Sequence, residues 1–278
     1  MNPIASVIAA SMVFTAVASP SQAAPAPTFD PILAVADQSQ CRLVNWGADR
    51  GSAPRAYIRG MALVYARALC EPDRADVKIA SEARGATGGP ADRKDALTWY
   101  DSMMTGQGMP NTTAGTPTLR HAYNLMIGLG MRESSGQHCV GRDLSANFTS
   151  ADSAEAGLFQ TSWGIRSADP SLPAMTAAYG ASNARCLSAV FSKNVQCKPA
   201  DAKTWGEGPG AQWQILTKAC PAFAAEYASV VLRRSGGSKG EFGPIRNRKA
   251  QVRVECDAML KSVEAAVASQ PGVCAALR

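Results

Sequence analysis

Glu133 is the residue of this 278-residue sequence best placed to do chemistry. It lies near the end of a predicted helix that begins at Thr116-Pro117 and stops at Ser134-Ser135-Gly136. At 3.6 residues per turn, Glu133 falls within the apolar face of this helix, which is formed by Leu119, Ala122, Tyr123, Met126 and Leu129. A carboxyl group held on an apolar face is partly removed from water, and its pKa rises. This position therefore predicts a general acid, a group that donates a proton to a reacting atom.

The opposite face of the same helix is polar, with Arg120, His121, Asn124 and Arg132, and is predicted to face away from the apolar contacts. Ser134 follows Glu133 where the helix ends, so its hydroxyl can bond either to the backbone or to a ligand.

A second motif, Gly157-Leu158-Phe159-Gln160, follows after an interval rich in turn-forming residues. Gly157 permits a close approach of the backbone to another group. Gln160 carries an amide that can bind a polar ligand group or brace a turn. Both residues are therefore candidates for contacts with a ligand.

The elements that must position these residues are mainly helical. A small β-hairpin is expected between Cys139 and Trp163, just after the Glu133 helix, and Val77–Ala80 resembles a short strand. Helical spacing elsewhere covers the ranges 54–69, 92–104, 184–191, 212–219, 222–232 and 250–268. The predicted fold class is thus mainly α (α+β).

The N-terminus carries the features of an export signal. The apolar run from Ile4 to Ala18 is followed by small residues ending at Ala23-Ala24, so residues 1–23 are interpreted as a signal peptide. Residues 24–40, rich in Ala and Pro, are expected to be a linker, and residues 41–278 a single domain. The first cysteine is Cys41, too late for a lipoprotein anchor, and no later apolar run is long enough for a membrane helix. These features predict a secreted or periplasmic protein.

Eight cysteines behind an export signal predict up to four disulfides, whose pairing the sequence leaves open among 105 possibilities. None of them forms a Cys-x-x-Cys pair, which disfavours zinc and redox sites, and we expect no metal or cofactor.

The net charge of +6 suits binding to an anionic polymer such as peptidoglycan, although many secreted proteins without that role carry a similar charge. Basic residues interleaved with aromatic residues are too few for a nucleic-acid partner. We expect a monomer.

The order Glu133-Ser134-Ser135-Gly136 and then Gly157-Leu158-Phe159-Gln160 resembles the lysozyme superfamily, and within it the soluble lytic transglycosylases and goose-type lysozymes. Those families pair E-S-x-G with G-L-M-Q, so Phe159 here replaces a methionine. The resemblance covers roughly residues 118–163 and leaves most of the chain unmatched.

The resemblance implies a lysozyme-like helical domain that cleaves the β-1,4 MurNAc–GlcNAc linkage of peptidoglycan, with Glu133 as the acid and Gln160 in the cleft. It also implies a C-terminal tyrosine facing the glutamate, for which Tyr227 is a candidate. The mechanism depends on a second carboxylate, about 6.5–9.5 Å away for inversion or about 5–5.5 Å for retention. Asp143, Asp152 and Glu155 lie between the motifs, and of the two aspartates Asp152 is preferred. Without such a partner the substrate closes its own ring, and lytic transglycosylation is slightly favoured.

Several alternatives remain open from the sequence. The chain can be a non-catalytic, disulfide-stapled protein that binds glycans in a lysozyme-like groove, or a glycosidase directed at chitin or chitosan. His138-Cys139 invites a thiol-hydrolase interpretation, which an oxidised cysteine would exclude. Trp163 and Trp205 can stack on sugar rings or lie in the core.

Overall fold

A computed structural model describes residues 28–86, 91–142, 150–270 and 272–278. The protein is mainly helical, as the sequence predicts. The helices of the first half are α1 (Asp30–Gln38), α2 (Arg55–Cys70), α3 (Ala75–Ala80), α4 (Ala91–Lys94), α5 (Ala96–Trp99), α6 (Asp101–Thr105) and α7 (Thr116–Ser134). Those of the second half are α8 (Ser171–Ala181), α9 (Ser188–Phe191), α10 (Pro209–Ala219), α11 (Pro221–Ser235), α12 (Gly243–Arg246), α13 (Val254–Ser269) and α14 (Gly272–Leu277).

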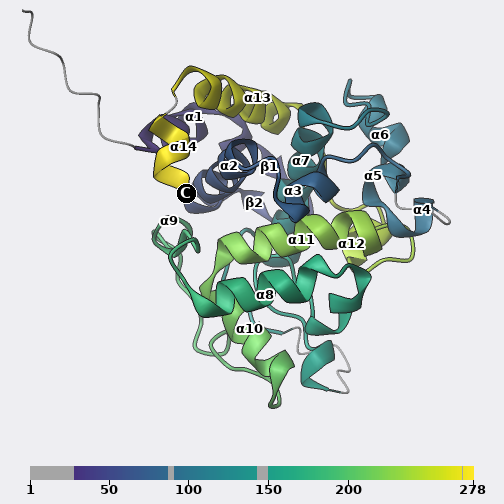
Figure 1. Ribbon diagram of the computed structural model, residues 1–278, viewed down its shortest axis with the longest axis vertical. Coiled ribbons are helices and arrows are strands. Elements are labelled where there is room, and N and C mark those ends of the chain that lie inside the picture. The colour runs from purple at the N-terminus through teal and green to yellow at the C-terminus, as the bar shows by residue number, and fades with distance from the viewer. Residues whose placement is uncertain (1–27, 87–90, 143–149, 271) are drawn as a thin grey trace, which may run out of the picture.

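Helix α11 crosses the middle of the molecule and organises the packing. In Figure 1 the helices α1, α2, α13 and α14 lie on one side of it and α8 and α10 on the other, and α11 contacts α2, α3, α7, α8 and α10. One continuous hydrophobic cluster includes residues from Ile32 to Leu277, so both ends of the described chain contribute to the same core.

Helix α7 carries Glu133 and begins and ends where the sequence predicts. Pro117 occupies its first turn, where the missing N–H costs nothing. At the other end Ser135 adopts the left-handed conformation with φ 54°, and the N–H of Gly136 donates to the carbonyl of Gly130 at 3.1 Å. This pair of features is a common helix stop, and it fixes the last turn in which Glu133 lies.

Three of the four residues on the polar face of α7, Arg120, His121 and Asn124, are buried. Arg120 donates to Asp257 at 2.7 Å and to Glu264 at 2.8 Å, both on α13, and His121 bonds to Asn111 at 2.9 Å. The polar side chains are covered because α13, far away in the sequence, supplies their partners. Periodicity within one helix does not contain that information.

Part of the expected linker 24–40 is structured. Within it α1 buries Ile32 and Ala36 against the core and packs on α2. The predicted strand at Val77–Ala80 is wrong, because these residues form the last turns of α3, whose Val77 and Ile79 are buried and which packs against α11 and α7. Packing against neighbouring helices outweighs the weak strand preference of Val and Ile here.

The sheet of the described residues lies before α7 instead of after it. Strands β1 (Asn45–Trp46) and β2 (Gly51–Ser52) pair antiparallel, with Asn45 opposite Ser52. In the described part of the interval after Cys139, where a hairpin is expected, the structure has one isolated antiparallel bridge, Ala156–Thr161. A 3₁₀ turn at Ala151–Ser153 precedes it. The rest of that interval includes residues 143–149, which lie outside the described residues.

All eight cysteines are paired, which confirms the predicted disulfides. The bridges are Cys41–Cys256, Cys70–Cys274, Cys139–Cys197 and Cys186–Cys220. Four disulfides indicate an oxidising environment, either extracellular or periplasmic. No single helix in the described part of the chain is long and apolar enough to cross a bilayer, although α10 and α11, bent by 113°, meet that criterion together.

Candidate active site

Glu133 sits in the last turn of α7 and is only partly exposed. The pKa of its carboxyl group is raised to about 8, mainly by burial and also by the nearby Glu155 carboxylate. The positive charges of Arg246, Arg50 and Arg132 act in the opposite direction. The net effect keeps Glu133 protonated at neutral pH, as the apolar face of the helix predicts.

Ser134 connects Glu133 to the second motif. Its hydroxyl lies 3.0 Å from the carbonyl oxygen of Gly130 and 2.8 Å from that of Leu158, so it can donate to either. Ser134 is 5% exposed. Of the two roles open to this residue, bonding to the backbone is the one seen, and it holds the end of α7 against the 157–160 turn.

The Gly157–Gln160 segment is a tight turn closed by the bridge between Ala156 and Thr161. Gly157 has φ 78°, and a Cβ there would lie 2.9 Å from Thr217 Oγ1 on α10. Gln160 is also left-handed, with φ 47°, and its amide nitrogen donates to the carbonyl of Gly157 at 2.9 Å. With 7% of its surface exposed, Gln160 braces the turn.

Ser162, just beyond this turn, joins it to two residues from the C-terminal half. The Ser162 hydroxyl donates to Glu241 Oε1 at 2.9 Å, and the Tyr227 hydroxyl donates to the Ser162 carbonyl at 3.3 Å. Burial raises the pKa of Glu241, and the bond from Ser162 partly offsets this. Tyr227 is fully buried on α11 between Trp213 and Phe223, and burial raises its pKa as well.

The predicted tyrosine thus reaches the turn that carries Gln160, through the backbone of Ser162. The charge of Arg246 on α12 lowers the pKa of both Glu133 and Glu241, against the effect of their burial. Arg246 itself is exposed and donates to the carbonyls of Gly240 and Glu241 at 2.7 and 2.6 Å.

Asp152 lies in the 3₁₀ turn and pairs with Arg166 at 3.1 Å, with 39% of each side chain exposed. The Asp152 carboxylate is thus part of an ion pair at the surface. Asp143, the other predicted aspartate, lies outside the described residues. Of the two carboxylates between the motifs that the structure describes, Glu155 is the one whose charge acts on Glu133.

The two candidate tryptophans have cations on their rings. The Arg166 guanidinium lies 4.9 Å from the centre of the partly buried Trp163 ring. Trp205 is 42% exposed, and the Arg142 guanidinium lies 3.8 Å from its ring centre. Cation–π contacts of this kind fix the rings but leave only Trp205 substantially accessible to a ligand.

His138, Cys139 and Cys197 lie within 4.8 Å of one another, a grouping that suits a metal ion if the sulfurs are thiolates. The two cysteines form a disulfide, so neither is a thiolate. The same bond removes the nucleophile that a thiol hydrolase needs.

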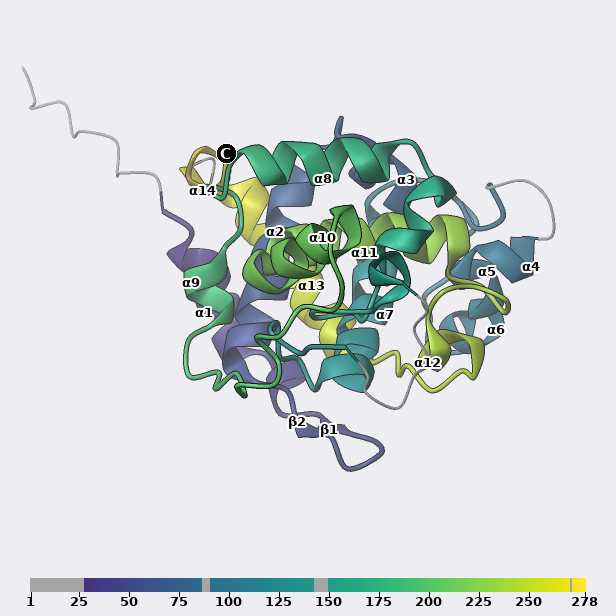
Figure 2. The ribbon, with the colours of Figure 1, turned by 90° about the horizontal axis from the view of Figure 1, so that it is seen from below.

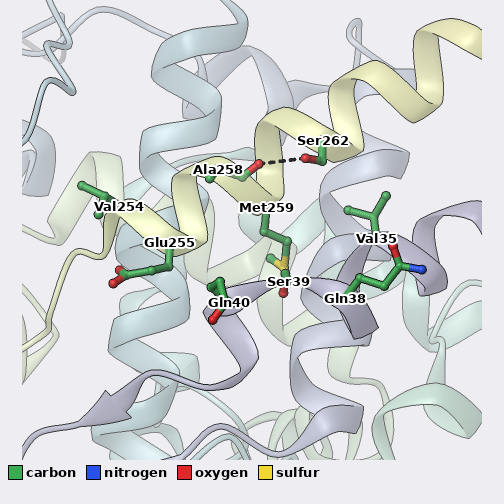
Figure 3. Close-up of a pocket in the computed structure, with 9 residues that line it drawn as sticks. All are labelled: Val35, Gln38, Ser39, Gln40, Val254, Glu255, Ala258, Met259 and Ser262. Atoms are coloured by element: carbon green, nitrogen blue, oxygen red, sulfur yellow. Dashed lines mark hydrogen bonds between the residues drawn. The ribbon is translucent and has the colours of Figure 1, made fainter.

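A hollow of about 560 Å³ lies between α1 and α13, lined by Val35, Gln38, Ser39, Gln40, Val254, Glu255, Ala258, Met259 and Ser262 (Figure 3). Its lining contains one carboxylate, Glu255, and none of the predicted site residues. The hollow is therefore separate from the site around Glu133.

Sequence reasoning missed Glu241, Arg246 and Arg50. Glu241 is the only carboxylate in the glycine-rich stretch 236–243, and an isolated acid in such a loop is a signal that could have identified it. Arg246 lies in the basic run 246–253, and no local pattern in that run links it to Glu133. Arg50 lies more than 80 residues from Glu133 in sequence, and no local pattern links the two.

The arrangement brings together an acid with a raised pKa, a second carboxylate near it, and a rigid turn bonded to the acid's helix. This set of groups can deliver a proton to a leaving oxygen and stabilise positive charge on the other fragment. Comparison of the chain with protein-family models, with curated proteins and with solved structures gives no match.

Proposed function

We propose that this protein is an exported, lysozyme-like enzyme that cleaves the β-1,4 MurNAc–GlcNAc linkage of peptidoglycan. The observation that carries the proposal is Glu133, a helix-end carboxyl group whose pKa is raised to about 8. It is supported by the bond from Ser134 to Leu158, which joins the E-S-S-G and G-L-F-Q motifs in space.

In this mechanism Glu133 donates its proton to the glycosidic oxygen while positive charge develops on the sugar ring. Glu155 is the nearby carboxylate that stabilises this charge, because its charge already acts at Glu133. Gln160 and Ser134 maintain the turn, and Tyr227 and Glu241 hold Ser162 behind it. Asp152 forms an ion pair with Arg166 at the surface and takes no part in the proton transfer.

Two outcomes of bond cleavage are possible, and lytic transglycosylation is slightly favoured. In that reaction the sugar's own hydroxyl attacks, and a 1,6-anhydro ring forms without water. In hydrolysis, water attacks and a reducing-end muramic acid forms. The two products differ by one water in mass, so mass spectra of the released muropeptides distinguish the reactions.

The test is release of soluble muropeptides from purified peptidoglycan by the wild type and by Glu133→Gln. The amide keeps the size of the side chain but cannot donate the proton, so release should fall by about 10² or more. Glu207→Gln, which changes an exposed carboxylate on another loop, is the matched control and should retain activity. Equal, negligible release by the wild type and Glu133→Gln would indicate a glycan-binding protein. Turnover of chitin in preference to peptidoglycan would indicate a different glycosidase.

A further inference from the structure

We propose that Arg50 is a positioning residue for Glu133, delivered to the end of α7 by the β1–β2 hairpin. The proposal rests on the assignment of Glu133 as the catalytic acid. It gives a function to an N-terminal segment that lies outside the two motifs.

The contacts of Arg50 bracket Glu133 along the chain. Arg50 Nη2 donates to the carbonyl of Arg132 at 2.7 Å, and Nη1 donates to Ser135 Oγ at 3.0 Å. One partner precedes Glu133 and the other follows the end of the helix by one residue. The exposed carbonyls at a helix C-terminus carry partial negative charge, so a guanidinium is favourable there and fixes the last turn.

The charge of Arg50 is not neutralised locally. Both of its partners are uncharged groups, and no carboxylate of the described residues pairs with it. Arg55, only five residues away, instead binds the two oxygens of Asp37, each at 2.6 Å. The field of Arg50 therefore reaches Glu133, where it opposes the effect of burial on the acid.

The hairpin that carries Arg50 is held in place from the C-terminal half of the chain. Trp46 is 2% exposed, the N–H of Gly47 donates to Gln251 Oε1 at 2.9 Å, and Arg253 Nη2 donates to the carbonyl of Asn45 at 3.1 Å. Figure 2 shows the hairpin as a narrow loop extending from the body of the molecule. Its position is thus set by buried and bonded groups at its base.

The backbone at Gln251 also packs directly on α7. A Cβ at Gly128 would lie 1.9 Å from the Gln251 carbonyl oxygen, so only glycine permits this approach. The turn before Arg50 contains Ala48 and Asp49, both left-handed at φ 61° and 57°. Non-glycine residues hold this conformation only where the surroundings demand it, here to turn the chain back and present Arg50 to α7.

The experiment measures the pKa of Glu133 directly, by NMR of ¹³C-labelled glutamate side chains, with the signal assigned by its loss in Glu133→Gln. In Arg50→Gln the pKa should rise by about one unit, because a positive charge is lost. Arg50→Met also removes the charge but has an apolar side chain, and it should raise the Glu133 pKa in the same way. Arg50→Lys keeps the charge and should change the pKa little, but it lacks the planar fork that places one nitrogen on each acceptor, so muropeptide release should fall about tenfold.

Arg93→Gln is the matched control, because it removes an exposed guanidinium on α4, outside both the hairpin and α7. It should leave the Glu133 titration unchanged. A Glu133 titration that is the same in the wild type, Arg50→Gln and Arg50→Met overturns the assignment of Arg50. Absence of muropeptide release by the wild type overturns the proposed function, whatever the titration shows.

Discussion

At the scale of single residues, the site depends on a carboxyl group that the fold keeps out of water. Burial and the Glu155 charge together outweigh the three arginines whose charges act on Glu133. The proton is therefore held more tightly in the folded than in the unfolded protein. Such a group costs stability whenever it must ionise.

This cost can be measured in Glu133→Gln. The folded pKa, about 8, lies above the unfolded value of 4.5, so the stability of the wild type falls as pH rises between these values and levels off above 8. The glutamine variant has no such loss. At about pH 9 it should be more stable than the wild type by roughly 2–4 kcal/mol, and at about pH 4 the difference should be small.

Urea unfolding of both proteins at the two pH values gives the free energies. In Glu207→Gln, with its exposed side chain, the difference from the wild type should be the same at both pH values. A Glu133→Gln variant that shows no gain at high pH would mean that the carboxyl group is well solvated in the folded protein.

At the scale of elements, the site lies where the end of α7 contacts the turn before Ser162. Ser134 provides the bond, and Gly157 lets the turn lie against Thr217 of α10. The close approach and the positive φ both require glycine at this position.

Gly157→Ala should accordingly destabilise the protein by about 1–3 kcal/mol and reduce activity, because the turn must move away from α10. Gly180→Ala is the control, since Gly180 is an exposed position of α8 with nothing within 4 Å of an added Cβ. Alanine should be neutral or stabilising there by up to about 1 kcal/mol. Thermal melts and muropeptide release compare the two variants, and equal behaviour would contradict the role given to Gly157.

The elements also show which features the sequence can predict. The contact between the two motifs is expected from the resemblance and not from local signals. The limits of α7 and most of the longer helices follow from local signals such as Pro117, the Ser135-Gly136 stop and apolar spacing. The buried side of α7 at Arg120 and His121 does not, because its partners lie on α13. Glu241 and Arg50 were missed for the same reason: they reach the site through contacts between distant segments.

At the scale of the whole molecule, the two ends of the chain support the site from outside the motifs. Cys41–Cys256 and Cys70–Cys274 join the N-terminal segment to α13 and α14, with sequence separations of 215 and 204 residues. The hairpin that carries Arg50 lies between Cys41 and α2. The extra helices thus fix the approach of Arg50 to α7.

These two bridges should act cooperatively. While one is intact, the other closes a loop of only about 47 residues, but after both are lost the loop from Cys41 to Cys256 is roughly 150 residues long, shortened only by the other two disulfides. Replacing both pairs by alanine should therefore cost about 1–1.5 kcal/mol more than the sum of the two single-pair losses. Urea unfolding of the two single-pair variants and the double-pair variant measures this, and strictly additive losses would contradict it.

The most direct test of the proposed chemistry is the pH dependence of muropeptide release by the wild type, from about pH 5 to about pH 10, beside Glu133→Gln. A buried acid that must be protonated predicts a rate that falls about tenfold per pH unit above a midpoint near 8, with negligible release by the variant throughout. A wild-type rate that stays constant or rises through pH 8, or a variant that keeps the wild-type rate, would contradict the role of Glu133 as the proton donor.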